Sequence, residues 1–302
     1  MRYNNFSSFL KNKYGEKVWK ISLHAGFSCP NLDGTLSDTG CIYCNNQAFN
    51  IQAGGSQSLD EQIRGSIQRL KKTRKVNKFI AYFQTFTNTY APVETLKKTY
   101  DTVLQYPEIV ALSIGTRPDC VDKDKLELIE SYSGTIDVWL EYGLQSIHNH
   151  TLKKINRGHI YQNFLEAIRL TRERNISICV HVIAGLPGEN RNDFLHTVQA
   201  VAELGINGIK FHPLHVLKDT ILEKMYDQDK ITLWSAEDYV EVICDALEIL
   251  PESVVIQRLT ADADKPFLVA PEWCSKHKKM EVIRLIDKKL EDRKTRQGYG
   301  RG

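Results

Sequence analysis

The sequence predicts an α/β fold: a partial (β/α)6 barrel, TIM-like but open on one side, followed by a C-terminal α extension. Short runs rich in Val and Ile alternate with amphipathic helical stretches, which is typical of a parallel sheet with helices outside it. Six such units end near residue 250, whereas a closed barrel has eight. These two observations favour a partial barrel over a doubly wound sheet.

Each expected strand is short, as strands buried in a parallel sheet usually are. The six strands are Val18–His24, Phe79–Phe83, Val110–Ile114, Ile136–Leu140, Ile178–Ile183 and Gly208–His212. The first long helix is expected to begin at Ser58, because Glu61 completes a capping box there. The other helices are expected at Val93–Gln105, Asp122–Ser131, Tyr161–Arg174 and Asn192–Leu204, and from Ser235 to just before Pro251.

The barrel is expected to occupy residues 18–250, between an N-terminal extension (1–17) and a C-terminal extension (251–302). The C-terminal extension contains a basic segment: residues 276–302 hold ten Lys and Arg against four Asp and Glu, a net charge of +6. Its apolar residues Met280, Ile283, Ile286 and Leu290 repeat at helical spacing. Residues 297–302 are expected to be a flexible tail.

The overall composition is that of an ordinary globular protein. The 302 residues carry 40 Lys and Arg against 37 Asp and Glu, and 42% of them are hydrophobic, which excludes a disordered or collagen-like chain. No segment approaches the roughly 20 apolar residues that span a bilayer, and the N-terminus lacks the apolar core of a signal peptide. We therefore expect a soluble, cytoplasmic protein without a membrane partner.

Three of the seven cysteines are crowded into one loop after the first strand. Cys29, Cys41 and Cys44 have the spacing C-x11-C-x2-C, and three thiolates on one loop can bind three irons of a [4Fe–4S] cluster. The fourth iron would then be open to the amino and carboxylate groups of S-adenosylmethionine (SAM). The alternative is a structural zinc site that adds His24 as the fourth ligand. The position at the carboxyl end of a barrel strand, and Tyr43 as an aromatic that could pack on an adenine, favour the cluster.

Several further segments accompany the cysteine loop. They are His24–Asn31, Thr116–Asp119, Glu141–Ser146, Ile155–His159 and Gly185–Glu189. With these segments the chain, from about Val18 to its end, resembles radical SAM enzymes. It is most similar to the YhcC/YtqA-type subfamily, which is related to the catalytic subunit of Elongator and to oxygen-independent coproporphyrinogen oxidase. The resemblance implies that Cys29, Cys41 and Cys44 hold a [4Fe–4S] cluster and that SAM is the second cofactor.

The resemblance also implies which residues contact SAM. In the porphyrinogen oxidases a Gln-Ser pair and an Arg twelve residues later do so, and Gln145, Ser146 and Arg157 match that spacing. A guanidinium suits the methionyl carboxylate because it can bind both oxygens. Gln84 and Thr85 stand where the family has a Gly-Gly-Glu-like run. His181 stands where the oxidases have an Asp, so either a cofactor contact or a core histidine is expected there.

Other candidates come from their places along the strands. Arg117 and Glu141 lie near strand ends on the expected cofactor side, where they serve either the active site or an ion pair that orders the barrel rim. His212, His215 and Lys218 follow the sixth strand, so they are candidates for the substrate side, or part of a loop without catalytic duty.

Three basic segments bear on the substrate. Residues 69–78 hold six positive charges and no acid, and residues 153–157 hold three more. The third segment is residues 276–302, with its net charge of +6. One such run is typical of a solvated helix end, but three together mildly favour RNA. With the resemblance to Elongator, the leading hypothesis is modification of a tRNA nucleoside, at the C5 side chain of the wobble uridine.

The specific reaction considered is conversion of a carboxymethylaminomethyl group to aminomethyl. The expected partners are tRNA and an external one-electron reductant of the flavodoxin or ferredoxin type. One alternative is a radical SAM enzyme that acts on a small molecule or a protein. The other is a zinc-stabilised RNA-binding module without catalysis. The sequence does not predict the oligomeric state.

Overall fold

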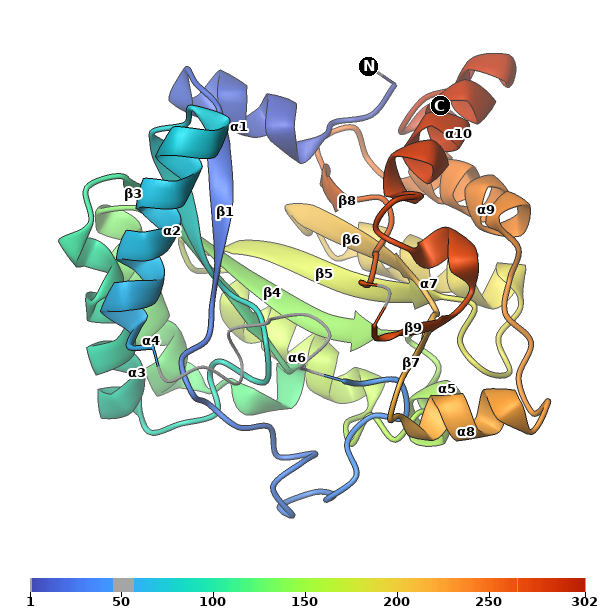
Figure 1. The fold of residues 1–302 in the computed structure, drawn as a ribbon, viewed down its shortest axis with the longest axis horizontal. Coiled ribbons are helices and arrows are strands. Elements are labelled where there is room, and N and C mark those ends of the chain that lie inside the picture. Colours follow the sequence, from blue (N-terminus) through green and yellow to red (C-terminus); the bar gives the residue numbers. More distant parts are fainter. Residues whose placement is uncertain (1, 46–56, 265, 302) are drawn as a thin grey trace.

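The computed structural model describes residues 2–45, 57–264 and 266–301. Seven parallel strands form one curled sheet in the order β1-β2-β3-β4-β5-β6-β8, so β1 and β8 lie at its two edges and the barrel is open between them (Figure 1). The strands are β1 (Val18–Leu23), β2 (Lys78–Phe83), β3 (Ile109–Thr116), β4 (Asp137–Gln145), β5 (Ser177–Ala184), β6 (Gly208–Pro213) and β8 (Val255–Arg258). The predicted partial α/β barrel is confirmed, with one strand more than expected.

Helices cover the outer face of the sheet (Figure 1). They are α2 (Leu59–Arg74), α3 (Val93–Asp101), α4 (Lys123–Ser131), α6 (Tyr161–Thr171), α7 (Arg191–Glu203) and α9 (Ala236–Ile249). The capping box is confirmed, since the Glu61 amide donates to Ser58 Oγ at 3.3 Å and the Ser58 amide donates to Glu61 Oε2 at 2.7 Å.

The remaining elements were not expected as separate units, apart from α10. They are α1 (Phe6–Tyr14), α5 (Asn149–Lys154), α8 (Ile221–Asp227), α10 (Lys279–Asp292) and the antiparallel pair β7 (Val216–Leu217) with β9 (Leu268–Ala270). Short 3-10 turns occur at Val103–Gln105, Pro118–Cys120, Tyr132–Gly134, Glu272–Cys274 and Tyr299–Arg301. None of the described helices combines the length and the apolar character that crossing a bilayer requires.

The two faces of the sheet differ in chemistry. On β4, Leu140 and Tyr142 are fully buried in the apolar core beneath the helices. Glu141 and Gly143 alternate with them and line the cavity inside the barrel, as the period of two along a strand requires. The helices therefore pack on an apolar outer face, and polar groups collect on the inner face.

Helix α1 packs where the strands begin. The rings of Phe6 and Phe9 stand edge-on to Trp139 near the start of β4, with centroids 5.9 and 6.0 Å apart. Phe6 and Phe9 pack against a buried cluster of Trp139, Cys179 in β5 and Val255 in β8. These aromatic contacts close the amino end of the barrel, so the polar interior is reached from the carboxyl end.

The C-terminal segment differs from its expected form. Ile286 and Leu290 are buried, as their helical spacing predicts, but Met280, in the same predicted set, is 56% exposed. Gln297 was expected in a flexible tail, yet it is 2% exposed because its side-chain amide donates to the carbonyls of Pro251 and Val254. This contact ties the end of the chain to the start of β8, away from the cysteine loop (Figure 1).

The basic charge of this segment is largely neutralised within the molecule. Arg293 pairs with Glu241, Asp245 and Glu248 on α9, and Lys289 pairs with Glu241. Lys289 and the following Arg293 therefore dock α10 on α9, and these two cations are engaged within the molecule.

Candidate metal and cofactor site

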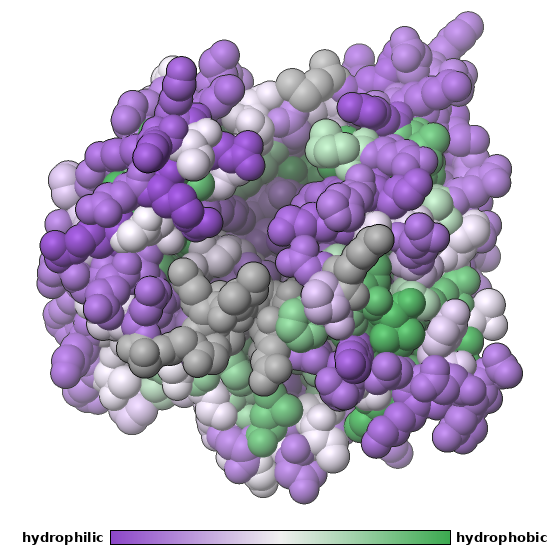
Figure 2. Space-filling view, viewed as in Figure 1, coloured by the Kyte–Doolittle hydropathy of each residue, from purple (hydrophilic) through white to green (hydrophobic). Residues whose placement is uncertain are grey.

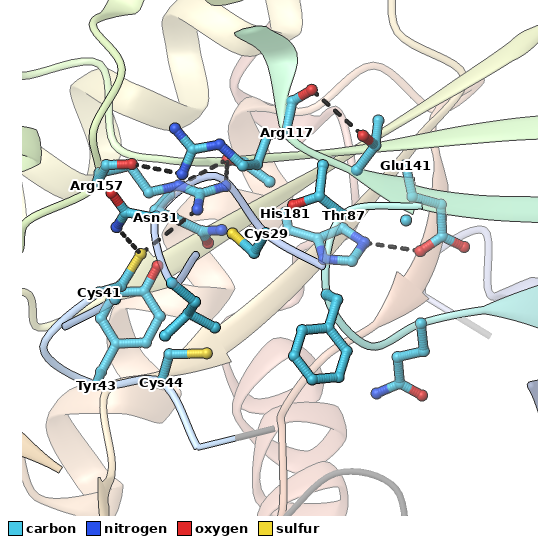
Figure 3. Close-up of a pocket in the computed structure, with 18 residues that line it drawn as sticks. Cys29, Asn31, Cys41, Tyr43, Cys44, Thr87, Arg117, Glu141, Arg157 and His181 are labelled. Atoms are coloured by element: carbon cyan, nitrogen blue, oxygen red, sulfur yellow. Dashed lines mark hydrogen bonds and ion pairs between the residues drawn. The ribbon is translucent and has the colours of Figure 1, made fainter. Parts of the chain in front are cut away.

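The three cysteines of the loop after β1 share one cavity at the carboxyl ends of the strands. Cys29, Cys41 and Cys44 all line it, with their sulfur atoms around a common space (Figure 3). The Cys44 amide donates to the Cys41 carbonyl at 2.9 Å, which fixes the turn between these two residues. In the space-filling view the face is hollowed near its centre, and the visible floor is hydrophilic (Figure 2).

The distance between the thiols distinguishes a single zinc ion from a four-iron cluster. A tetrahedral zinc with Zn–S bonds near 2.3 Å brings its sulfurs to within about 3.8 Å of one another. Among the described residues, the only His, Cys, Asp and Glu group with ligand atoms within 4.8 Å of one another is Glu141, Cys179 and His181. The loop thiols and His24 are thus too far apart for one zinc ion, whereas a four-iron cluster holds each cysteine on a different iron.

The surroundings of the thiols suit an iron–sulfur cluster held by thiolates. Burial, followed by the nearby Cys41 and Cys29 sulfurs, raises the pKa of the Cys44 thiol to about 12. Bound iron would lower this pKa again, because a metal ion stabilises the thiolate form of its cysteine ligand. Asn31 Nδ2 and Arg157 Nη1 lie 3.6 and 3.5 Å from Cys41 Sγ, so two donors face a sulfur that would carry negative charge. The residues present therefore fit a [4Fe–4S] cluster.

Arg157 is held rigidly at the edge of this cavity. Its Nε and Nη2 donate to the Gly143 carbonyl at 3.2 and 2.6 Å. Arg117, only 2% exposed, donates to the Arg157 carbonyl at 2.7 Å and pairs with Asp119 through two hydrogen bonds of 2.9 and 2.7 Å. The Arg117 guanidinium is therefore engaged in positioning Arg157, and Arg157 is the guanidinium placed beside the cluster loop.

The Gly143 site offers a test of Arg157. A Cβ at position 143 would lie 2.7 Å from Arg157 Nη2 and 2.8 Å from Gln145 Nε2, so Gly143→Ala must displace both side chains. We expect a loss of SAM affinity of about tenfold or more, because a displacement of about 1 Å at a positioned group is costly. Equilibrium dialysis of reconstituted protein with labelled SAM measures it. Gly65→Ala, which places its methyl in open space on α2, is the matched control. Equal affinity in both variants would show that Arg157 does not hold SAM.

The structure brings most of the predicted cofactor residues together. Those that line the cavity are Tyr43, Gln84, Arg117, Glu141, Gln145, Arg157 and His181. Gln145 has a φ of 76° at a register shift between β4 and β5. Strained backbone of this kind at a non-glycine residue persists where surrounding structure enforces it and clusters at functional sites.

Three candidates lie outside both cavities. Thr85 Oγ1 is 3.3 Å from His24 Nδ1, and Thr85 does not line the cofactor cavity. Ser146 is fully buried and donates to Glu189. Lys218 is exposed at the end of β7. The other two substrate-side candidates, His212 and His215, line a second cavity that adjoins the first.

A charged network fills the barrel interior below the cofactor cavity. Glu141 is fully buried and accepts hydrogen bonds from Lys20 (3.3 Å), Lys210, Ser113 (2.5 Å) and His181 Nε2 (2.7 Å). Burial opposes its ionisation, but Lys20 and Lys210 hold the pKa of Glu141 well below its ordinary value.

His181 belongs to the same network. Burial, helped by the charge of Lys210, lowers the pKa of His181 to about 4. Its ring is therefore neutral at physiological pH, and its Nε2 hydrogen bond to Glu141 leaves it partnered at the junction of the two cavities.

Sequence reasoning did not identify several of these residues. Lys20 and Lys210 were passed over, although a lysine inside an otherwise apolar strand is a signal of an inward-facing polar position. Asn31 gave no signal beyond its place in the cysteine loop.

Comparison with known proteins agrees with this geometry. The family model for the Radical SAM superfamily matches residues 38–201, and the Radical_SAM C-terminal domain matches residues 206–292. YtqA of Bacillus subtilis is 39% identical over 98% of this chain and 92% of its own. A tRNA uridine(34) acetyltransferase of Methanocaldococcus infernus is 27% identical over 53% of this chain and 30% of its own.

A solved structure shares the fold. Archaeal Elp3 from Methanocaldococcus infernus, without its N-terminal residues, aligns with a TM-score of 0.70 at 20% identity, over 93% of this chain and 64% of the other. Because the superfamily model covers more than half of the chain, and YtqA aligns over nearly all of it, this protein belongs to the radical SAM superfamily and has a [4Fe–4S] cluster and SAM as its cofactors.

Proposed function

We propose that this radical SAM enzyme modifies the C5 side chain of the wobble uridine in tRNA. The observation that carries the proposal is the similarity to tRNA uridine(34) acetyltransferases, which extends over 164 residues of this chain. When bound, the cluster and SAM supply an adenosyl radical that removes a hydrogen atom from a substrate. The chain's own part is to hold a splayed-out base at the open carboxyl end of the barrel.

The basic segments support this proposal only in part. Residues 69–78 follow the exposed end of α2 into β2, where Lys71 pairs with Glu108 and Lys78 with Glu16, at the amino end of the sheet. Lys153 and Lys154 close α5, which follows the carboxyl end of β4 near the cysteine loop. If an anticodon loop binds at the cofactor end, Lys153 and Lys154 are the basic pair placed to contact its phosphates.

In the proposed reaction a hydrogen atom is removed from the CH2 of the carboxymethyl group, and the resulting carbon radical loses one electron to the oxidised cluster and one proton to give an imine. Water then cleaves the imine C=N bond, which releases glyoxylate and leaves aminomethyl. A flavodoxin- or ferredoxin-type protein would deliver the electron that reductive SAM cleavage requires.

Nucleoside analysis of bulk tRNA tests this proposal. In cells that lack the gene, we expect carboxymethylaminomethyl-uridine to accumulate and aminomethyl-uridine to disappear. Anaerobic incubation of that tRNA with reconstituted protein, SAM and dithionite should then restore the aminomethyl form. A Cys41→Ala protein serves as the control. An unchanged nucleoside profile, together with no turnover of the tRNA, would contradict the proposal and favour a small-molecule or protein substrate.

A further inference from the structure

A second cavity opens directly beside the cofactor cavity. The two share the residues Tyr43, Cys44, Gln84, Gln145 and His181. The second cavity continues along the inner face of β5, β6 and β8, and its own walls are Tyr82, Ile183, His212, Pro213, Leu214, His215 and Arg258. A group bound in it would lie against the cysteine loop, next to the place where SAM is expected.

The described residues that form the walls of this cavity include the permanent cation Arg258 and no Asp or Glu. Arg258 is half-buried at the end of β8. Within the described ranges, its guanidinium makes no hydrogen bond or ion pair. Arg117 and Arg174, which also have little exposure, pair with Asp119 and Glu130, and the buried Arg157 donates to the Gly143 carbonyl. A half-buried guanidinium without a counter-charge is costly, so the site is built for an anion that the chain itself does not supply.

The buried carboxylate on the inner face of the sheet, Glu141, already has its own cationic partners. Lys210 pairs with Arg258 in the register of β6 and β8, which places both side chains on the inner face of the sheet. Glu141 on this face already accepts from Lys210, Lys20 and His181. Glu141 is therefore already engaged by its own partners, and among the described residues it leaves the charge of Arg258 uncompensated.

A hydrogen-bonding atom without a partner lies in the same wall. His212 follows Lys210 by two residues on β6 and so shares the inner face. Its Nε2 is buried and has no hydrogen-bond partner among the described residues. Burial, and then the charge of Arg258, hold the pKa of His212 well below its ordinary value, so the ring is neutral and can donate one N–H.

We propose that Arg258 and His212 form a subsite that binds a carboxylate of the substrate, beside the carbon that gives up the hydrogen atom. A guanidinium binds the two oxygens of a planar carboxylate side by side, and the His212 ring adds a further donor. Ile183, Pro213 and Leu214 form an apolar part of the wall, which suits a small organic acid group better than a hydrated backbone phosphate. The inference rests on the proposed function, in which the substrate side chain carries a carboxylate that the product lacks.

Kinetics with Arg258→Gln test the subsite. With tRNA carrying carboxymethylaminomethyl-uridine as the probe, we expect kcat/KM to fall about 10- to 100-fold, as for a lost hydrogen bond to a charged group, with partial rescue in Arg258→Lys. Arg296→Gln is the matched control, because Arg296 is exposed and pairs with Glu252 at the opposite end of the barrel. Iron content checks that each variant holds its cluster. Equal kcat/KM in wild type and Arg258→Gln would overturn the subsite.

Chemical labelling keeps this inference separate from the tRNA proposal. Phenylglyoxal modifies free guanidinium groups, and mass spectrometry measures the labelled fraction of Arg258 in the wild-type holoenzyme. We expect tRNA with the carboxymethylaminomethyl group to protect Arg258 and tRNA with aminomethyl to leave it reactive. If wild type turns over neither tRNA, the proposed function fails, and N-methylglycine and inorganic phosphate replace the tRNA as probes. Protection by N-methylglycine then supports a carboxylate subsite. Protection by phosphate alone, or by neither probe, overturns it.

Discussion

Cys41→Ala is expected to yield a folded, colourless protein without an iron–sulfur cluster and without reductive SAM cleavage. Cys41 is the cysteine whose sulfur faces both Asn31 and Arg157, and it is 7% exposed in the cofactor cavity. Without it two loop thiolates remain, and a four-iron cluster held at only two irons loses its fixed position. Iron and sulfide analysis after anaerobic reconstitution, with assay of deoxyadenosine release, measures the loss. We expect both to fall to background.

Cys120→Ala provides the matched control for this experiment. Cys120 is equally buried, at 7% exposure, and lies near the site, with its Sγ 4.0 Å from Asp119 Oδ1. It does not line the cofactor cavity. Removing its sulfur should cost about 1 kcal/mol of stability and leave iron content and SAM cleavage intact. If Cys41→Ala keeps its cluster, or Cys120→Ala loses it, the assignment of the ligands is wrong.

The barrel could be predicted largely because parallel strands have a strong local signature. Six short apolar runs predicted six of the observed strands, most of them within one or two residues of their observed ends, although β4 continues five residues past its predicted end, to Gln145. β8 was missed because it is only four residues long and ends in Gln257 and Arg258, so its pattern is too short to separate from a loop. Because β8 was missed, Arg258 was placed in the C-terminal extension and was not considered as a site residue. In the structure it lies on the inner face of the main sheet.

The residues of the site could be predicted where a short separation along the chain forces their side chains to lie close together. Cys41 and Cys44 are three residues apart, so they must lie close together whatever the rest of the chain does. Thr85 and Ser146 are adjacent to residues that line the cavity, but their side chains point elsewhere. The direction of a side chain at a strand end depends on register shifts, such as the one at Gln145, that a single sequence does not reveal.

The ion-pair partners of a basic residue could not be predicted from its position in the sequence. The basic segment at the end of the chain was counted as a possible polyanion site, but its Arg293 pairs with three carboxylates on α9 that lie far from it in sequence. In contrast, Arg258 belongs to none of the basic segments, and no carboxylate of the described residues pairs with it. A charge is informative about a ligand only after its internal partners are known.

The interior network provides the second large effect: Glu141→Gln is expected to cost about 3–5 kcal/mol of unfolding free energy at neutral pH. The substitution keeps the volume of the side chain but removes the charge that Lys20 and Lys210 share. Burial lowers the pKa of Lys210, so this lysine can lose its proton in the variant, which limits the cost. The double variant Glu141→Gln/Lys210→Met should therefore be more stable than Glu141→Gln alone.

Urea unfolding of the apoprotein measures these differences, with Glu166→Gln as the control. Glu166 pairs with Arg169 on α6, but both side chains are more than half exposed, so its loss should cost less than about 1 kcal/mol. Equal losses in the Glu141 and Glu166 variants would mean that the buried network contributes no more than a surface pair. That outcome would leave Lys20 and Lys210 without the role assigned to them here.

The pH dependence separates lost charge from lost packing. The folded-state pKa of Glu141 is depressed, so its ion pairs contribute stability above the unfolded pKa of about 4.3, and this contribution is lost as pH falls towards the lower folded value. Glu141→Gln lacks the proton that wild type takes up in this range. The stability gap between wild type and variant should therefore be full at neutral pH and narrow below about pH 4. A gap that stays constant with pH would show that Glu141 stabilises the barrel by its shape and hydrogen bonds rather than by its charge.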